Sequence, residues 1–479
     1  MCAACGVSSH LSAGELDPPS APSPQRAPEP SSDPAAATAA QAVAAGGAVA
    51  AGGAADADGA GVPAKFAALR NKECRTYLVG GMLSMMADNI EHVLTYWVLW
   101  QEFHSPALAG FAVISHWVPF LVFSVYFGGL ADRYDCRRVI QVAQGMFMAV
   151  SAAWGVLFVT GTLTVPAACL LLVVHGMAGS LWSPAEQLML HDFVGNAALP
   201  SAVRLNATAR SLGILCGPVV GAGLLLGLGS TAGIFVNVAI YLPLTLFLFR
   251  TKVTGHSRDE AVARTRVTFV QALRVLPEVS RNPTILAMIL LGGLGSFFIG
   301  ASLQSAMPIF AHDDGAGSAG TAYSVLLFAN GAGGVVGGLL LEVTGRLRPT
   351  VRTAVVSTFV YGGSMLAFAV TRNYPFAVLM LLVGGVANLA SMSIGQTLVQ
   401  LLAPAGKRGQ VVGVYGMSAS GLRAGSGFTV GLLGSAIGVH WSLGLSSAAL
   451  VVCTALVMAW TVRAAARTRE PAEAAAQPA

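Results

Sequence analysis

Residues 164–174 read TVPAACLLLVV, a stretch without a charged side chain. Comparable stretches recur along the chain, which is 54% hydrophobic and only 10% charged. Soluble domains, by contrast, carry roughly a quarter charged residues. The composition therefore predicts a membrane protein whose apolar segments need a lipid solvent.

From Thr76 onward, apolar segments of about 20 residues or more alternate with polar turns. A helix of this length crosses the hydrocarbon core of a bilayer. The pattern predicts an all-α membrane protein with twelve transmembrane helices. The predicted spans are 76–100, 107–131, 139–160, 164–190, 203–228, 231–250, 284–310, 320–342, 349–370, 375–402, 411–437 and 441–463.

The polar segments divide the chain into five parts. Residues 1–70 are rich in Ala, Pro, Gly and Ser, which predicts a disordered cytoplasmic tail. They lack the basic stretch and apolar core of a signal peptide. Residues 251–283 are predicted to link a six-helix bundle at 71–250 to a second at 284–463, and 464–479 form a second cytoplasmic tail.

Positive charge gives the predicted orientation, because Lys and Arg near helix ends stay on the cytoplasmic side. If both termini are cytoplasmic, the 27 Lys and Arg residues lie on the cytoplasmic side with two exceptions, Arg372 and Arg423. Arginine outnumbers lysine 23 to 4 and alanine is abundant, which favours a GC-rich bacterial genome. We therefore expect a bacterial inner membrane protein with both termini in the cytoplasm.

An internal repeat appears when the sequence is shifted by 210 residues. The shift places residues 128–132 (GGLAD) over 338–342 (GLLLE), and Gly217 over Gly427. Two parallel repeats predict two pseudo-symmetric six-helix bundles, with a substrate site between them that faces each side of the membrane in turn.

Two motifs resemble those of a known family. Residues 128–138 (GGLADRYDCRR) resemble the loop 2–3 signature of the major facilitator superfamily, and 213–223 (GILCGPVVGAG) resemble its antiporter signature, G-x-x-x-G-P-x-x-G. Residues 183–187 (SPAEQ) and 205–206 (LN) resemble the bacterial drug:proton antiporter branch that includes enterobactin and macrolide exporters. The resemblance covers about residues 70–465.

The first motif predicts a conformational latch. The carboxylate of Asp132 lies in a short turn, where it can pair with a neighbouring helix N-terminus or an arginine. The resemblance implies a contact with the span at 411–437 that breaks when the bundles rock, although Cys136 departs from the family pattern. The alternative is that the cations only set topology. The candidate latch residues are Gly128, Asp132, Arg133, Arg137, Arg138, Glu342 and Arg346.

The second motif predicts close packing of the span at 203–228. Gly213, Gly217 and Gly221 share one face and permit another helix to approach, while Pro218 favours a bend. The resemblance implies an exporter that exchanges its substrate for protons. The alternative is ordinary packing of small residues.

Ionisable residues inside a span are functional candidates because burying them is costly. Asp88, Glu91 and His92 lie within one turn near the centre of the first span. Arg423, near the middle of the span at 411–437, needs a partner. Our hypothesis is that one acid pairs with Arg423 while Asp88 or Glu91 carries the coupling proton. The alternative is a static polar cluster with Asn89.

Further polar and aromatic side chains are candidates for the substrate cavity, namely Trp182, Glu186, Asn206, Gln304, Asn388 and Gln396. Glu186 is alternatively a hydrated residue at the cytoplasmic mouth. Related exporters often carry an arginine where this chain has His175. A packed, hydrogen-bonded histidine is the favoured interpretation there, over a titrating group.

The sequence lacks the G-x-x-x-x-G-K-[ST] loop of ATP-driven machines, which leaves the proton gradient as the energy source and no cofactor. Cys2 and Cys5 have no downstream Cys/His cluster, so no metal site is expected. We predict a secondary active transporter, not an enzyme, that performs proton-coupled efflux of a small amphipathic, drug-like molecule. It is expected to work as a monomer in the bilayer without nucleic acid. Alternatives are a narrow exporter of a siderophore or lipid-like metabolite, an importer, and a non-transporting sensor or membrane-embedded enzyme.

Overall fold

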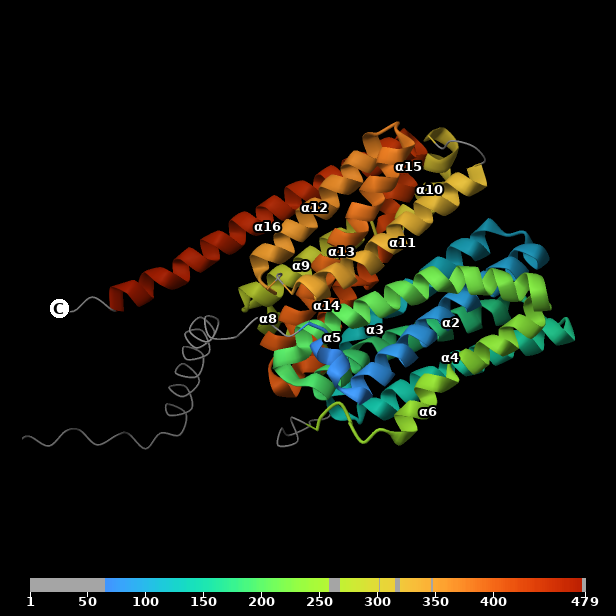
Figure 1. Cartoon of the computed structure of the whole chain (residues 1–479), viewed down its shortest axis with the longest axis horizontal. Helices are drawn as coiled ribbons and strands as arrows, with labels where there is room; N and C mark the ends of the chain where they lie inside the picture. The colour runs from blue at the N-terminus through green and yellow to red at the C-terminus, as the bar shows by residue number, and fades with distance from the viewer. Residues whose placement is uncertain (1–64, 258–267, 301, 315–318, 346–347, 476–479) are drawn as a thin grey trace, which may run out of the picture. The chain divides into compact units, whose positions relative to one another are not determined.

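The chain folds into helices. The computed structural model describes residues 65–257, 268–300, 302–314, 319–345 and 348–475, and every regular element in these ranges is helical (Figure 1). The first half contains α2 (Lys72–Phe103), α3 (Pro106–Arg133), α4 (Cys136–Thr160), α5 (Val165–Ile240) and α6 (Leu242–Arg250). Short helices α7 (Phe269–Leu273) and α8 (Val275–Ser280) lie in the predicted linker.

The second half contains the remaining long helices. They are α9 (Pro283–Phe298), α10 (Ser302–Asp314), α11 (Ala319–Thr344), α12 (Val351–Val370), α13 (Tyr374–Leu402), α14 (Arg408–Ala419), α15 (Leu433–Ile437) and α16 (Val439–Ala475). Between α14 and α15 the backbone is irregular. A 3-10 turn, η3 (Gly421–Gly425), is followed by a π-helical stretch, η4 (Gly427–Leu432). The predicted span at 411–437 is therefore not a continuous α-helix.

Local sequence explains where several helices begin. The side chain of Ser105 accepts a hydrogen bond from the backbone NH of Leu108, and Pro106 occupies the first turn of α3. Asp135 caps α4 in the same way through the NH of Arg137. Small polar caps satisfy backbone donors that have no partner within the helix. The Asp135 cap begins α4 directly after the turn from α3, and this turn carries part of the first motif.

Helix α5 is interrupted by two glycines with backbone angles that other residues rarely adopt. Gly195 has φ 69° and ψ 179°, and Gly229 has φ 78° and ψ 170°. A straight helix of 76 residues would be roughly 114 Å long, far more than the roughly 30 Å of a bilayer core. The two breaks divide α5 close to the boundaries of the spans predicted at 164–190, 203–228 and 231–250.

The surface of the helices is apolar enough to face lipid. Val219 is 73% exposed and Leu226 is 88% exposed. Seven helices of the described ranges are long and apolar enough to cross a membrane, and the longest run, Val165–Arg250, contains three of the predicted spans. The all-helical prediction is confirmed, whereas the count of twelve stays a prediction.

The ordered first half begins earlier than the predicted tail boundary at residue 70. Residues Ala67–Arg70 form a 3-10 helix, η1, in which Ala68 is fully buried. The backbone NH of Ala68 donates to the hydroxyl of Ser201 at 3.2 Å. The structure does not describe residues 1–64, on which the rest of the tail prediction falls.

We predict that Gly229→Ala destabilises the protein by about 1–3 kcal/mol, because its φ of 78° strains any residue with a Cβ. An added Cβ would meet no atom within 4 Å, so backbone strain acts alone. The measurement is the thermal unfolding of purified protein in detergent. Gly223→Ala is the matched control, because that glycine has equal space and an ordinary φ. Equal melting temperatures for the two variants would contradict the prediction.

Candidate functional site

A cavity of about 1270 Å³ lies between the two halves. Of the six candidates predicted for the cavity, all line it except Gln304, whose side chain lies outside the described residues. Its wall includes, from the first half, Asp88, His92, His116, Trp117, Trp182, Glu186, Asn206 and Arg210, and from the second half, Asn330, Tyr361, Asn388, Gln396, Tyr415 and Arg423. Aromatic and polar groups from both halves therefore face one space.

Exposed apolar side chains line part of the cavity. Ile114 and Ile214 both line it and are 54% and 41% exposed. Ile114 lies near the start of α3, and Asp132 lies near the end of the same helix, roughly 27 Å away. The cavity therefore extends well away from the predicted latch.

At the latch end the two halves are in direct contact. The carboxylate of Asp132 accepts hydrogen bonds from the backbone NH groups of Gly409 at 2.5 Å and Gln410 at 2.9 Å, in the first turn of α14. A carboxylate is stabilised at a helix N-terminus by the free NH groups and the helix dipole. A Cβ on Gly128 would overlap the carbonyl of Gly409. The cavity is thus closed where α3 meets α14.

Glu342 makes the corresponding contact from the second half to the first. It is 1% exposed, and its carboxylate lies 2.7 Å from Nη2 and 2.8 Å from Nε of Arg204. It also accepts hydrogen bonds from the hydroxyl of Ser201 and the backbone NH of Phe66. The sequence did not indicate Arg204 as the partner. Arg346 lies outside the described residues.

The other cations of the first motif bind locally. Arg137 pairs with Asp135 at 2.6 Å, Arg138 donates to Gln141 at 2.8 Å, and Arg133 lies 5.0 Å from the centre of the Tyr134 ring. Among the four charged candidates of this motif, Asp132 is the one with a hydrogen bond to the described part of the other half.

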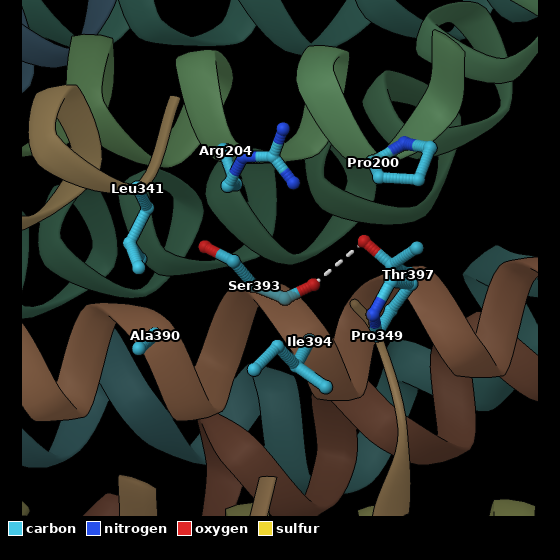
Figure 2. A pocket seen from close by; sticks show the side chains of 8 residues that line it. All are labelled: Pro200, Arg204, Leu341, Pro349, Ala390, Ser393, Ile394 and Thr397. Atoms are coloured by element: carbon cyan, nitrogen blue, oxygen red, sulfur yellow. Dashed lines mark hydrogen bonds between the residues drawn. The ribbon is translucent and has the colours of Figure 1, made fainter. Parts of the chain in front are cut away.

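Figure 2 shows a second place where the halves nearly touch, with Pro200 and Arg204 of α5 above Ser393 and Thr397 of α13. The cavity between them is only about 10 Å³, roughly the space of one water molecule. The hydroxyl of Thr397 is turned back to the carbonyl of Ser393 at 2.7 Å. The α5–α13 contact adds to the closure made by Asp132 and Glu342.

The acids of the first span bind a histidine rather than an arginine. His175 lies 2.8 Å from Asp88 through Nε2 and 2.9 Å from Glu91 through Nδ1. The expected pairing of one acid with Arg423 is wrong, since within the described ranges no carboxylate lies within ion-pair distance of that guanidinium. Arg423 instead lies 4.9 Å from the centre of the Trp117 ring.

His175 is packed and hydrogen-bonded, as the favoured interpretation of the sequence had it. His116, whose ring lies beside that of His175, was not among the candidates predicted from the sequence. It is an ionisable residue within an apolar span, so the criterion that selected Asp88 would also have selected it. In the prediction from the sequence, Arg210 counted only among the cations that set the orientation in the membrane.

Glu186 lies on the cavity wall and is 1% exposed, so it is not a hydrated group at a mouth. One carboxylate oxygen is 3.1 Å from Nη1 of Arg210. The other oxygen is buried and receives no hydrogen bond. The guanidinium of Arg210 lies 5.4 Å from the centre of the Trp182 ring.

The glycines of the second motif face α2. A Cβ on Gly217 would overlap the side chain of Asn89, and one on Gly221 would come within 3.1 Å of the Val93 side chain. The close approach predicted for these glycines is therefore made to α2. It occurs at the turn that carries Asp88 and Glu91.

Two helical halves around a central cavity that is closed at one end are the arrangement of a membrane transporter. The profile of a family described as transmembrane secretion effector matches residues 63–478. The chain belongs to this family, within the major facilitator superfamily. A curated relative, described as an uncharacterized MFS-type transporter y4rN of Sinorhizobium fredii, is 27% identical over 279 residues, 57% of this chain and 67% of the relative.

Solved structures share the fold. The human organic anion transporter MFSD10 has a TM-score of 0.60 at 16% identity, over 80% of this chain and 98% of that one. The E. coli fucose:proton symporter has a TM-score of 0.59 at 14% identity, over 80% and 98%. A bacterial homologue of the iron transporter ferroportin in an outward-facing state has a TM-score of 0.63 at 15% identity, over 81% and 99%. These similarities confirm the major facilitator fold and do not assign a substrate.

We predict that Gly128→Val prevents closure of the latch end, because the new side chain occupies the space of the Gly409 carbonyl. Spin labels at Tyr134→Cys and Lys407→Cys, in a background without other cysteines, measure the separation of the two halves there. The distance should lengthen by about 2 Å or more, since carbon atoms in contact lie about 3.5–4.0 Å apart. Gly145→Val, at a position with no neighbour within 4 Å, is the control. An unchanged distance in the Gly128 variant would contradict the role of this contact.

Proposed function

We propose that the protein exports a small amphipathic molecule by alternating access, driven by the proton gradient. The observation that carries the proposal is the ion pair between the buried Glu186 and the partly exposed Arg210 on the cavity wall. The pair lies where the cargo must pass, and Glu186 has one oxygen without a hydrogen-bond donor.

The absence of a donor to this oxygen favours the neutral, protonated form of Glu186. Burying an ionised carboxylate costs far more free energy than burying a carboxylic acid. Protonation of Glu186 would also release Arg210, which is then available to the cargo. Loss of the proton would restore the ion pair at 3.1 Å and expel an anionic group from Arg210. Proton and cargo would therefore exchange at one place, as in an antiporter.

Asp88 and Glu91 are less suited to this task in the closed-latch state. Both are already bonded to His175, and Glu91 also accepts a hydrogen bond from Ser151. Both carboxylate oxygens of each acid already have a hydrogen-bond partner among the described residues, whereas one oxygen of Glu186 has none. Glu186 is consequently our choice for the proton site, in place of the acids favoured by the sequence.

The cavity wall indicates the chemistry of the cargo. Trp117 and Trp182 offer flat apolar surfaces, and each lies beside a guanidinium, Arg423 and Arg210 respectively. Arg423 has no carboxylate partner among the described residues, and its buried Nε makes no hydrogen bond. An unpaired cation in a cavity attracts an anionic group. We propose a cargo that combines an aromatic or aliphatic body with an anionic group.

The direction of transport follows from the latch. If the latch end is cytoplasmic, as the positive charges predict, the present state opens outward, where a pump driven by external protons releases its cargo and loads a proton. The proteins of similar fold are described as an organic anion transporter, a fucose:proton symporter and a homologue of an iron transporter, so they do not narrow the choice of cargo.

The test of the proton site is Glu186→Gln in proteoliposomes with an imposed pH gradient, using carboxyfluorescein as an anionic probe and rhodamine 6G as a cationic one. Gradient-driven transport should disappear, because the amide cannot exchange a proton. Exchange of labelled for unlabelled probe without a gradient should persist, because the cavity is retained. Wild-type gradient-driven transport in the variant would overturn the assignment of Glu186.

The test of the anionic cargo is Arg423→Gln in the same vesicles. We expect carboxyfluorescein transport to fall by about tenfold or more, since a hydrogen bond to a charged group contributes about 1.5–3 kcal/mol. Transport of rhodamine 6G should change much less. A wild-type protein that moves only the cationic dye, or equal losses for both dyes, would contradict the role of Arg423.

A further inference from the structure

Four side chains from three helices converge on the wall of the cavity. Asp88 and His92 come from α2, His116 from α3 and His175 from α5. One donor atom of each side chain lies within 4.8 Å of the others. The ring of His92 is 5.0 Å from those of both His116 and His175. Three imidazoles and a carboxylate therefore surround one point.

We infer that these four residues bind a divalent transition-metal ion. Imidazole nitrogen and carboxylate oxygen together suit Zn²⁺, Co²⁺, Ni²⁺ or Fe²⁺. Metal–ligand distances of about 2.0–2.2 Å place tetrahedral ligand atoms roughly 3.4 Å apart. Donors within 4.8 Å reach that geometry when the side chains turn inward by about an ångström, without a shift of the helices.

The surroundings of His175 match those of a metal ligand. A metal-bound histidine donates its second ring NH to a carboxylate or carbonyl, which orients the ring. Nδ1 of His175 lies 2.9 Å from Glu91, and Nε2 faces Asp88. Glu91 is fixed in turn by the hydroxyl of Ser151, which Asn237 approaches at 3.4 Å. Glu91 is therefore the positioning residue of the site.

One of the other two histidines is not satisfied by its neighbours. Nδ1 of His116 is buried without a hydrogen-bond partner in the described part of the chain. The side chain of His92 is 22% exposed, and its Nδ1 is 3.9 Å from Asp88. Buried polar atoms are nearly always paired, so the unpaired Nδ1 of His116 calls for an explanation. A cation at the centre of the cluster supplies the missing partner.

The charges of the cluster also fit a divalent ion. Asp88 and Glu91 are 8% and 2% exposed, and within the described ranges neither forms an ion pair with a lysine or arginine. Histidines that bind a metal are neutral. In the metal-free protein His175 pairs with both carboxylates. Once His175 has given up a proton to become a neutral ligand, one divalent ion balances the two acids.

The ion can enter from the cavity, because Asp88, His92 and His116 line it. When bound, it joins α2, α3 and α5, which all belong to the first half. The inference goes beyond the proposed export, since Glu186 carries the proton in that proposal and metal binding needs no cargo.

The experiment is a titration of the purified full-length protein with Co²⁺, followed by its visible absorption, and with Zn²⁺, followed by calorimetry and thermal unfolding. We expect one ion per protein, an absorption band of tetrahedral Co²⁺, and a melting temperature that rises with Zn²⁺ concentration. His116→Gln and His92→Gln should each weaken binding by about 100-fold or more. Glu91→Gln should weaken it by about 10–100-fold, as for other residues that orient a metal ligand.

The control is His312→Gln, a histidine with 81% of its side chain exposed, which should bind as the wild type does. The metal-free melting temperature of each variant shows that it folds. Because His175 also bonds two carboxylates, the test relies on His92 and His116, which do not. Wild-type affinity in a His92→Gln/His116→Gln double variant, or no saturable binding near one ion per protein, would overturn the site. The Glu186→Gln assay tests export separately, so either proposal can fail alone.

Discussion

A charge inside a helical membrane protein must be compensated by a group from the protein, because lipid offers none. The present structure meets this constraint mostly across helices. Asp132 is held by the N-terminus of α14, Glu342 by Arg204, Glu186 by Arg210, and Asp88 and Glu91 by His175. Asp132, Glu342, Asp88 and Glu91 therefore tie together helices that are distant in the sequence, while Glu186 and Arg210 join two parts of α5. The positions of the charges determine which helices meet.

The contacts of Asp132 and Glu342 form a reciprocal pair. Asp132 reaches from the first half to α14, and Glu342 reaches from the second half to the Ser201–Arg204 turn of α5. The 210-residue repeat places these acids at equivalent positions, but their partners differ. Asp132 binds the backbone NH groups of Gly409 and Gln410. Glu342 binds the side chains of Arg204 and Ser201. The repeat thus preserves the location of the contact and not its chemistry.

Much of the architecture could be predicted from the sequence. The length of each apolar segment and the positions of Lys and Arg around it directly indicate a transmembrane span. The details that failed depend on contacts between helices. No sequence pattern shows that His175 would reach both Asp88 and Glu91, and Arg423 was assigned an acid although it faces Trp117. The metal cluster was missed for the same reason, since His116 and His175 lie in different spans.

The irregular backbone between α14 and α15 has a consequence for Arg423. A 3-10 turn is wound more tightly than an α-helix and a π-helical stretch more loosely. Arg423 lies within η3, so its side chain is rotated away from the direction it would have in a continuous α-helix. A change between these windings would turn the guanidinium within the cavity and leave α14, with its bonds to Asp132, in place.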